Sequence, residues 1–131
     1  MDMMKYQSEI DIEDIHIDGV DAAIGCALYY DDVDMYFMIL RSFVNNTPEV
    51  IDQIEEVSMD HMTDYQLRIH GIKSVCAMIG AEEIRARAYE LELYAKDKNL
   101  EEILKRNPSF IQDTRDLVSR IQEWLAEIIE D

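Results

Sequence analysis

One histidine and one lysine lie three residues apart in the segment His70-Gly71-Ile72-Lys73-Ser74. In a helix, residues three and four apart share a face, so the imidazole of His70 and the ammonium of Lys73 are expected side by side. A neutral imidazole is nucleophilic near physiological pH, because its unperturbed pKa is about 6.5. A nearby ammonium can pair with phosphoryl oxygens. The spacing therefore indicates a nucleophilic imidazole exposed beside a fixed cation.

The residues around this pair fall on two faces of one predicted helix. Apolar side chains recur at steps of three and four and form the stripe that a bundle buries: Met62, Tyr65, Ile69, Ile72, Cys76 and Ile79. On the other face, Gln66 lies one turn before His70, where it can hydrogen-bond the second ring nitrogen and fix the tautomer. Small residues on that face leave room for another protein to approach the imidazole: Gly71, Ser74 and Ala77.

Several helices are predicted to position this site. Asp21 is expected to cap a short helix that ends near residue 30, and a second helix is expected over 33–58. The helix that carries His70 should begin at residue 60 or 64 and close at Gly80, which has the backbone freedom for a helix end. A fourth helix should open at 81–83 with acidic residues at its positive end.

The two prolines are predicted to interrupt helices, because proline removes a backbone donor and clashes with the preceding turn. Pro48 should kink the helix over 33–58 near residues 45–47 or divide it into two helices. A short turn over 100–106 should break before Pro108, and the final helix should follow over 110–128. Together these elements predict an all-α fold, an antiparallel four-helix bundle with a short N-terminal helix packed across one end.

The order of these helices and the motif around His70 resemble those of histidine-containing phosphotransfer (HPt) domains. The signature is His70-x-Ile72-Lys73-Ser74, with Gly80 ten residues after the histidine. Supporting matches flank it in the segments 19–21, 32–43 and 81–95, and the likeness covers residues 19–128. Two residues depart from the pattern: Ser74 stands where glycine is commoner, and Cys76 where serine or alanine is usual. Neither departure removes the nucleophile or the lysine.

The resemblance implies a phosphocarrier in a multistep phosphorelay, and neither a kinase nor another enzyme. Its phosphoryl donors and acceptors are then aspartates of response-regulator receiver domains, with a hybrid histidine kinase upstream. The receiver supplies Mg²⁺ and most of the catalysis, so we expect this chain to bind no cofactor and no metal. Docking needs apolar contacts, and the candidates are Ile24, Leu28 and Leu67 beside the small residues around His70.

Composition limits the other possibilities. The 131 residues are enough for one core, and we expect an arm over 1–18, partly mobile, followed by the bundle over 19–131. A formal charge of −17 argues against nucleic acid or anionic membranes as partners. We expect the chain to be cytoplasmic, because no apolar run is long enough to span a bilayer and no signal peptide is evident. We also expect it to be a monomer. Cys26 and Cys76 fall at apolar helical positions and are expected to be unpaired.

Two other readings remain open. The bundle could be an interaction module that binds or sequesters a receiver domain without carrying phosphate. It could also bind a metal, since Glu13-x-x-His16 has a spacing found in di-iron bundles, and His61 is a further candidate ligand. Only one copy of that motif is present, however, and a di-iron site needs two together with two further glutamates.

Overall fold

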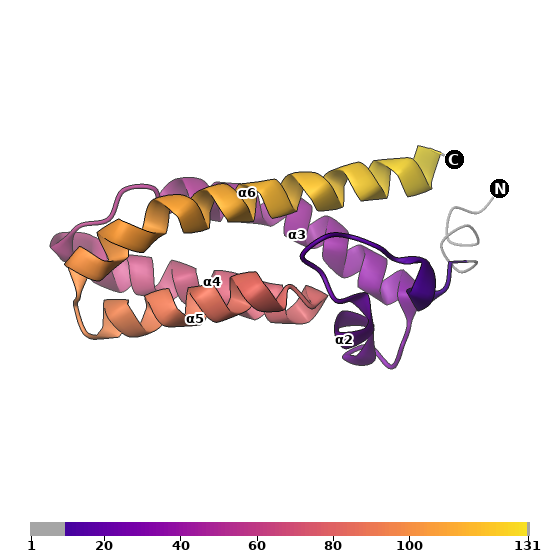
Figure 1. The fold of residues 1–131 in the computed structure, drawn as a ribbon, viewed down its shortest axis with the longest axis horizontal. Coiled ribbons are helices and arrows are strands. Elements are labelled where there is room, and N and C mark those ends of the chain that lie inside the picture. The colour runs from indigo at the N-terminus through magenta and orange to yellow at the C-terminus, as the bar shows by residue number, and fades with distance from the viewer. Residues whose placement is uncertain (1–9, 131) are drawn as a thin grey trace.

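The computed structural model describes residues 10–130, and every regular element in this part of the chain is helical. The order is η1 (Ile12–Asp14), α2 (Ala22–Ala27), α3 (Val33–Gln53), η2 (Met59–His61), α4 (Met62–Ile79), α5 (Glu82–Lys96) and α6 (Leu100–Glu130). Figure 1 shows these helices along the chain. Over residues 10–130, none of them combines the length and apolar character that crossing a membrane requires.

The four long helices form a bundle in which consecutive helices run in opposite directions (Figure 1). Helix α4 packs against α3 and α5, and α6 packs against the same two helices. The short helix α2 lies at one end of the bundle, in contact with α3 and α4. The predicted all-helical class is therefore confirmed.

Local signals at the helix ends agree with the structure. The side chain of Asp21 accepts a hydrogen bond from the backbone N–H of Ile24 at 3.2 Å, and that of Asp32 accepts one from Met35 at 3.1 Å. Gly80 closes α4 with a φ of 82°, and a Cβ there would collide with the carbonyl oxygen of Asp21. Gly80 thus allows the segment before α2 to lie directly against the end of α4.

The division into two helices predicted as one outcome at Pro48 is wrong, because α3 continues through the proline as one helix from Val33 to Gln53. It also ends earlier than the predicted residue 58. Phe43, Thr47 and Ile51 are all buried, at spacings of four residues on both sides of Pro48. Dividing α3 here would expose part of this face, so packing outweighs the hydrogen bond that the proline removes.

The break predicted before Pro108 is also wrong, since α6 is continuous from Leu100 to Glu130. The buried side chain of Asn107 donates a hydrogen bond to the carbonyl of Ile54 at 2.8 Å. Its oxygen accepts one from the hydroxyl of Tyr65 at 2.7 Å. These contacts hold the turn before the proline against the junction of α3 and α4, where a helix break would leave buried polar groups without partners.

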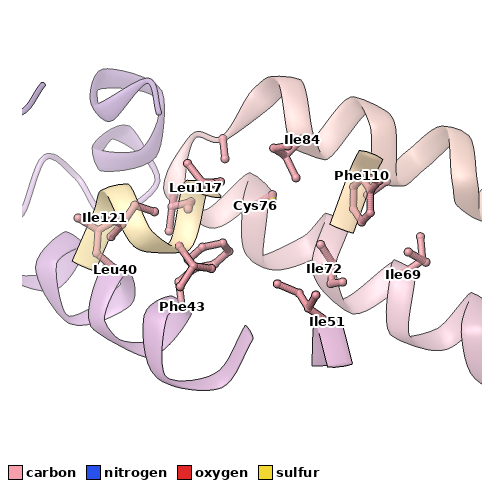
Figure 2. Packing of buried hydrophobic residues seen from close by; sticks show 14 of the residues in the cluster. Leu40, Phe43, Ile51, Ile69, Ile72, Cys76, Ile84, Phe110, Leu117 and Ile121 are labelled. Atoms are coloured by element: carbon pink, nitrogen blue, oxygen red, sulfur yellow. The ribbon is translucent and has the colours of Figure 1, made fainter. Parts of the chain in front are cut away.

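One apolar core runs through the bundle, and Figure 2 shows part of it. Side chains from α3, α4, α5 and α6 meet there, including Phe43, Ile72, Ile84 and Leu117. Ile15 and Ile17 also belong to this core, so the described part of the predicted arm, 10–18, packs on the bundle. Residues 1–9, where the rest of that arm falls, lie outside the described residues.

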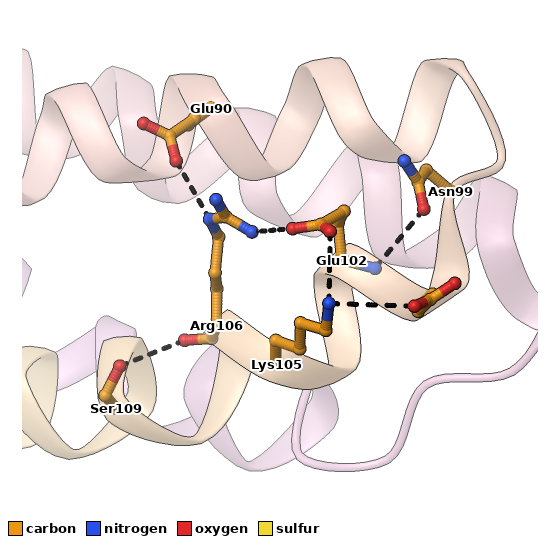
Figure 3. A network of polar contacts seen from close by, with 7 residues as sticks. Glu90, Asn99, Glu102, Lys105, Arg106 and Ser109 are labelled. Carbon is orange, nitrogen blue, oxygen red and sulfur yellow. Dashed lines mark hydrogen bonds and ion pairs between the residues drawn. The ribbon is translucent and has the colours of Figure 1, made fainter.

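Polar contacts fix the short connection from α5 to α6 (Figure 3). The side chain of Asn99 accepts a hydrogen bond from the backbone of Glu102 at 3.2 Å and so caps α6. Arg106 of α6 reaches back to Glu90 of α5 at 3.1 Å and also bonds Glu102. Exposed ion pairs of this kind add little stability, but they join the two helices at this end of the bundle.

Candidate functional site

His70 lies in the middle of α4 with its side chain 57% exposed. Its neighbours Ile69 and Ile72 are buried in the core, so the backbone that carries the imidazole is fixed on that side. The ring nitrogen Nδ1 is 2.6 Å from Oε2 of Glu92, which belongs to α5. The imidazole is therefore held at one nitrogen while its ring remains accessible to solvent.

The side chain of Glu92 is buried and has two cationic or potentially cationic partners. Its second oxygen, Oε1, accepts a hydrogen bond from Nζ of Lys73 at 2.6 Å. Burial acts to raise the pKa of Glu92, but hydrogen bonds and charge from Lys73 and His70 outweigh it. The net result is a pKa below the ordinary value for glutamate, so the carboxyl is ionised at neutral pH.

The ionised carboxylate determines which ring nitrogen of His70 carries the proton. A carboxylate can only accept hydrogen bonds, so Nδ1 must be the donor in the contact with Glu92. In the neutral imidazole, the lone pair is then on Nε2. The buried carboxylate thus leaves the other nitrogen of an exposed ring as the nucleophile.

Lys73 is close to the imidazole through their common partner. Its side chain is 23% exposed, and Nζ lies 5.3 Å from the centre of the Tyr89 ring in addition to its contact with Glu92. The face of the ring and the carboxylate both attract the ammonium. A cation is therefore held beside the carboxylate that contacts the imidazole.

The orienting role predicted for Gln66 is corrected by this geometry, because the partner of Nδ1 is Glu92. Gln66 is half-buried on α4, and the described residues include no hydrogen bond from it to His70. Glu92 is not among the site residues predicted from the sequence. A signal for it was present, since Glu92 follows Ala88 by four residues and precedes Ala95 by three, within the buried stripe of α5. An acid in an apolar stripe needs a partner.

The six predicted docking residues occupy two places on the molecule. Leu67 and Gly71 are exposed on α4 beside His70, and Ser74 and Ala77 are half-buried on the same helix. Ile24 and Leu28 are exposed at α2, next to the end of α4. That end is about 15 Å from His70 along the helix, by the rise of 1.5 Å per residue.

The other candidate groups have different surroundings. Nδ1 of His61 is 3.1 Å from the hydroxyl of Ser58, and His16 is exposed. Over residues 10–130, no three residues that could ligate a metal come together. Cys26 and Cys76 are free and buried, and burial raises their pKa to about 11 and about 12. Both are therefore neutral thiols near pH 7.

These features, a helical bundle with an exposed imidazole held on its surface, are those of a phosphoacceptor module. The model of the Hpt domain family matches residues 38–124, which include all of α4 and α5, and the chain belongs to this family. Hpt domains are phosphocarrier modules of phosphorelays. No curated protein and no solved structure matches the chain.

Proposed function

We propose that the chain is a phosphocarrier that accepts a phosphoryl group on Nε2 of His70 and donates it from there. The carboxyl side chains of response-regulator receiver domains are its donors and acceptors, and a hybrid histidine kinase stands upstream. The observation that supports this proposal best is the exposed imidazole whose Nδ1 is bound by a buried, ionised carboxylate.

The transfer is a displacement at phosphorus. The lone pair of Nε2 attacks the phosphorus of an aspartyl phosphate, the N–P bond forms, and the P–O bond to the aspartate breaks. The aspartate leaves as a carboxylate, and no proton has to move. Nδ1 keeps its proton and its hydrogen bond to Glu92 while the ring gains positive charge. The carboxylate stabilises that charge, and the reverse displacement returns the phosphoryl group to an aspartate.

Lys73 supplies the second charge that the phosphorylated state needs. In the unphosphorylated protein its ammonium is paired with Glu92. A phosphoryl group on Nε2 adds oxygens that carry negative charge and compete with Glu92 for that ammonium. Glu92 is then left with the cationic ring as its partner, so each charge in the site still has an opposite neighbour.

Mg²⁺ is expected in the receiver domain and not in this chain. The chain supplies the nucleophile, the ammonium and the surface on which the receiver docks. We propose that it acts in this way as a cytoplasmic monomer.

The experiment that tests the proposal is transfer from a phosphorylated receiver domain. Label should move onto the wild-type chain in a form that acid hydrolyses and alkali does not, and His70→Gln should abolish the transfer. His61→Gln is the matched control, because His61 is also exposed but contacts only Ser58 among the hydrogen bonds described. Equal labelling of His70→Gln and the wild type would refute the assignment. Receiver binding without labelling of the wild type would favour the interaction module.

A further inference from the structure

The aromatic ring of Tyr89 lies beside the ammonium of Lys73. Nζ of Lys73 is 5.3 Å from the centre of that ring and 2.6 Å from Oε1 of Glu92. Tyr89 precedes Glu92 by three residues on α5, so the two partners of the ammonium lie one turn apart on the same helix face. Helix α5 therefore holds Lys73 by two contacts of different kinds, a charged hydrogen bond and the face of an aromatic ring.

The packing of the core does not explain an aromatic side chain at position 89. Tyr89 is 49% exposed, whereas Ala88 and Leu91, its neighbours on α5, are buried in the core. Over residues 10–130, no hydrogen bond involves the hydroxyl of Tyr89. The ring contact found for it in this part of the chain is the one with Lys73. The ring is therefore placed to act on the ammonium.

Contact with the ring restricts a side chain that is otherwise flexible. Lysine carries its charge on a stem of four methylene groups, and an unrestrained ammonium samples many positions. The side chain of Lys73 is 23% exposed, whereas that of Lys105, whose partners are carboxylates of its own helix, is 60% exposed. The ammonium of Lys73 is thus confined to a small region next to the carboxylate that binds His70.

The ring and the carboxylate of Glu92 differ in how they respond to a phosphoryl group. Phosphoryl oxygens compete with the carboxylate for the N–H groups of the ammonium. The face of the ring instead attracts the ammonium through its quadrupole. This attraction does not depend on which acceptors the three N–H groups bind. The hydrogen bonds of the ammonium can therefore change partners while the ammonium stays over the ring.

We propose that Tyr89 is a positioning residue for Lys73, whose ring keeps the ammonium at the site as its hydrogen bonds pass from Glu92 to the phosphoryl group. This role rests on the proposed function, since it takes His70 as the phosphoacceptor. Tyr89 acts through Lys73 and not on the reacting atoms. The ring face is the part that matters and the hydroxyl is dispensable, because the quadrupole belongs to the ring.

The first test compares Tyr89→Leu with Tyr89→Phe in transfer from a phosphorylated receiver domain. Leucine removes the ring face, and the maximal rate of transfer should fall about fivefold. Phenylalanine keeps the face, and its rate should be within about twofold of the wild type. The receiver concentration that gives half the maximal rate should change by less than about twofold in both variants. If Tyr89→Leu changes only that concentration, Tyr89 is a docking contact and the positioning role is wrong.

Tyr94→Leu is the matched control. Tyr94 is also on α5, and its ring centre is 4.8 Å from the guanidinium carbon of Arg106. The control therefore removes a cation–π contact from the same helix without affecting Lys73, and its maximal rate should be within about twofold of the wild type. An equal loss in Tyr94→Leu and Tyr89→Leu would contradict a specific role for Tyr89.

The second test asks whether Tyr89 acts through Lys73. When Lys73→Met is already present, adding Tyr89→Leu should slow transfer by less than about twofold, because the ammonium that the ring positions is gone. A further loss of about fivefold would mean that the ring acts by another route, and the proposal would be wrong.

NMR of the unphosphorylated chain checks the contact without any receiver. Protons above the face of an aromatic ring resonate upfield, so the methylene protons next to Nζ of Lys73 should lie upfield in the wild type and in Tyr89→Phe relative to Tyr89→Leu. Identical positions in all three proteins would refute the contact and the positioning role with it.

The positioning role and the phosphocarrier proposal fail in different ways. If the wild type takes up label and Tyr89→Leu transfers at the same rate, Tyr89 has no positioning role and the phosphocarrier proposal stands. If the wild type takes up no label from the receiver, the phosphocarrier proposal is refuted, and the positioning role is refuted with it.

Discussion

Oε2 of Glu92 lies 2.6 Å from Nδ1 of His70, although the two residues are 22 positions apart and belong to different helices. The contact depends on the packing of α4 against α5, the most extensive pairing of helices in the bundle. It couples a residue in the buried stripe of α5 to a ring on the surface of α4. The orientation of the nucleophile is therefore a property of the tertiary structure.

Replacing Glu92 with glutamine should slow phosphotransfer about tenfold, the range expected for loss of one charged hydrogen-bonding partner. The amide has nearly the shape of the carboxylate, but it has no charge to stabilise the cationic ring. Initial rates of transfer from a phosphorylated receiver would measure the effect. Glu90→Gln is the control on the same helix, since Glu90 is exposed and pairs with Arg106. Equal rates for the two variants would contradict the role of Glu92.

The wild type and Glu92→Gln should also differ in how their free energy of unfolding depends on pH. The pKa of Glu92 is lower in the folded chain than its ordinary value, which is about 4.3 in an unfolded chain. The ionised carboxyl therefore stabilises the fold fully above about pH 4.3, and this contribution is lost as the pH falls through the lowered pKa. Denaturant unfolding at pH 7 and pH 3 should show the advantage over Glu92→Gln shrinking at the lower pH. A constant difference would contradict the inferred pKa shift.

Lys73→Met should lower the rate of phosphotransfer by about tenfold or more, because it removes the cation that we propose pairs with the phosphoryl oxygens. Lys73→Arg keeps the charge and should retain much of the activity. Transfer rates and the lifetime of the isolated phosphorylated chain are the measurements. Lys105→Met is a control, because Lys105 is an exposed lysine of α6 that pairs with Glu101 and Glu102. If Lys73→Met transfers phosphate at the wild-type rate, Lys73 has no role in the transfer.

Two glycines of the α4 region should respond to alanine in opposite directions. Gly71→Ala should stabilise the fold by about 1 kcal/mol, since the added Cβ has free space in a helix. Gly80→Ala should destabilise it by about 2 kcal/mol or more, because Gly80 has a positive φ and faces the carbonyl of Asp21. Thermal or denaturant unfolding would measure both. A Gly80→Ala variant as stable as the wild type would contradict the predicted difference between the two glycines.

The helices and the exposed position of His70 could be predicted because their signals are local. The apolar stripe from Met62 to Ile79 identified α4 and its exposed face, and Asp21 and Gly80 marked helix ends correctly. These features depend on residues one or two turns apart. The spacing of His70 and Lys73 is likewise a local signal, because the two residues lie within one turn of the same helix.

The errors concern contacts between distant segments. Pro48 and Pro108 lie inside helices because the residues around them are buried against other helices, which a local rule for proline does not include. Helical periodicity relates only residues of one helix, so it predicts Gln66, on the same helix, as the partner of His70. Glu92 belongs to α5, and its approach to His70 depends on how α4 and α5 pack.

The most direct test of the central claim is NMR of the chain with ¹⁵N-labelled histidine, before and after phosphorylation by a receiver domain. We expect Nδ1 of His70 to carry the proton before transfer and the phosphoryl group to be attached to Nε2 afterwards. A phosphoryl group on Nδ1, or on another residue, would contradict the role of Glu92 and of His70 as described here.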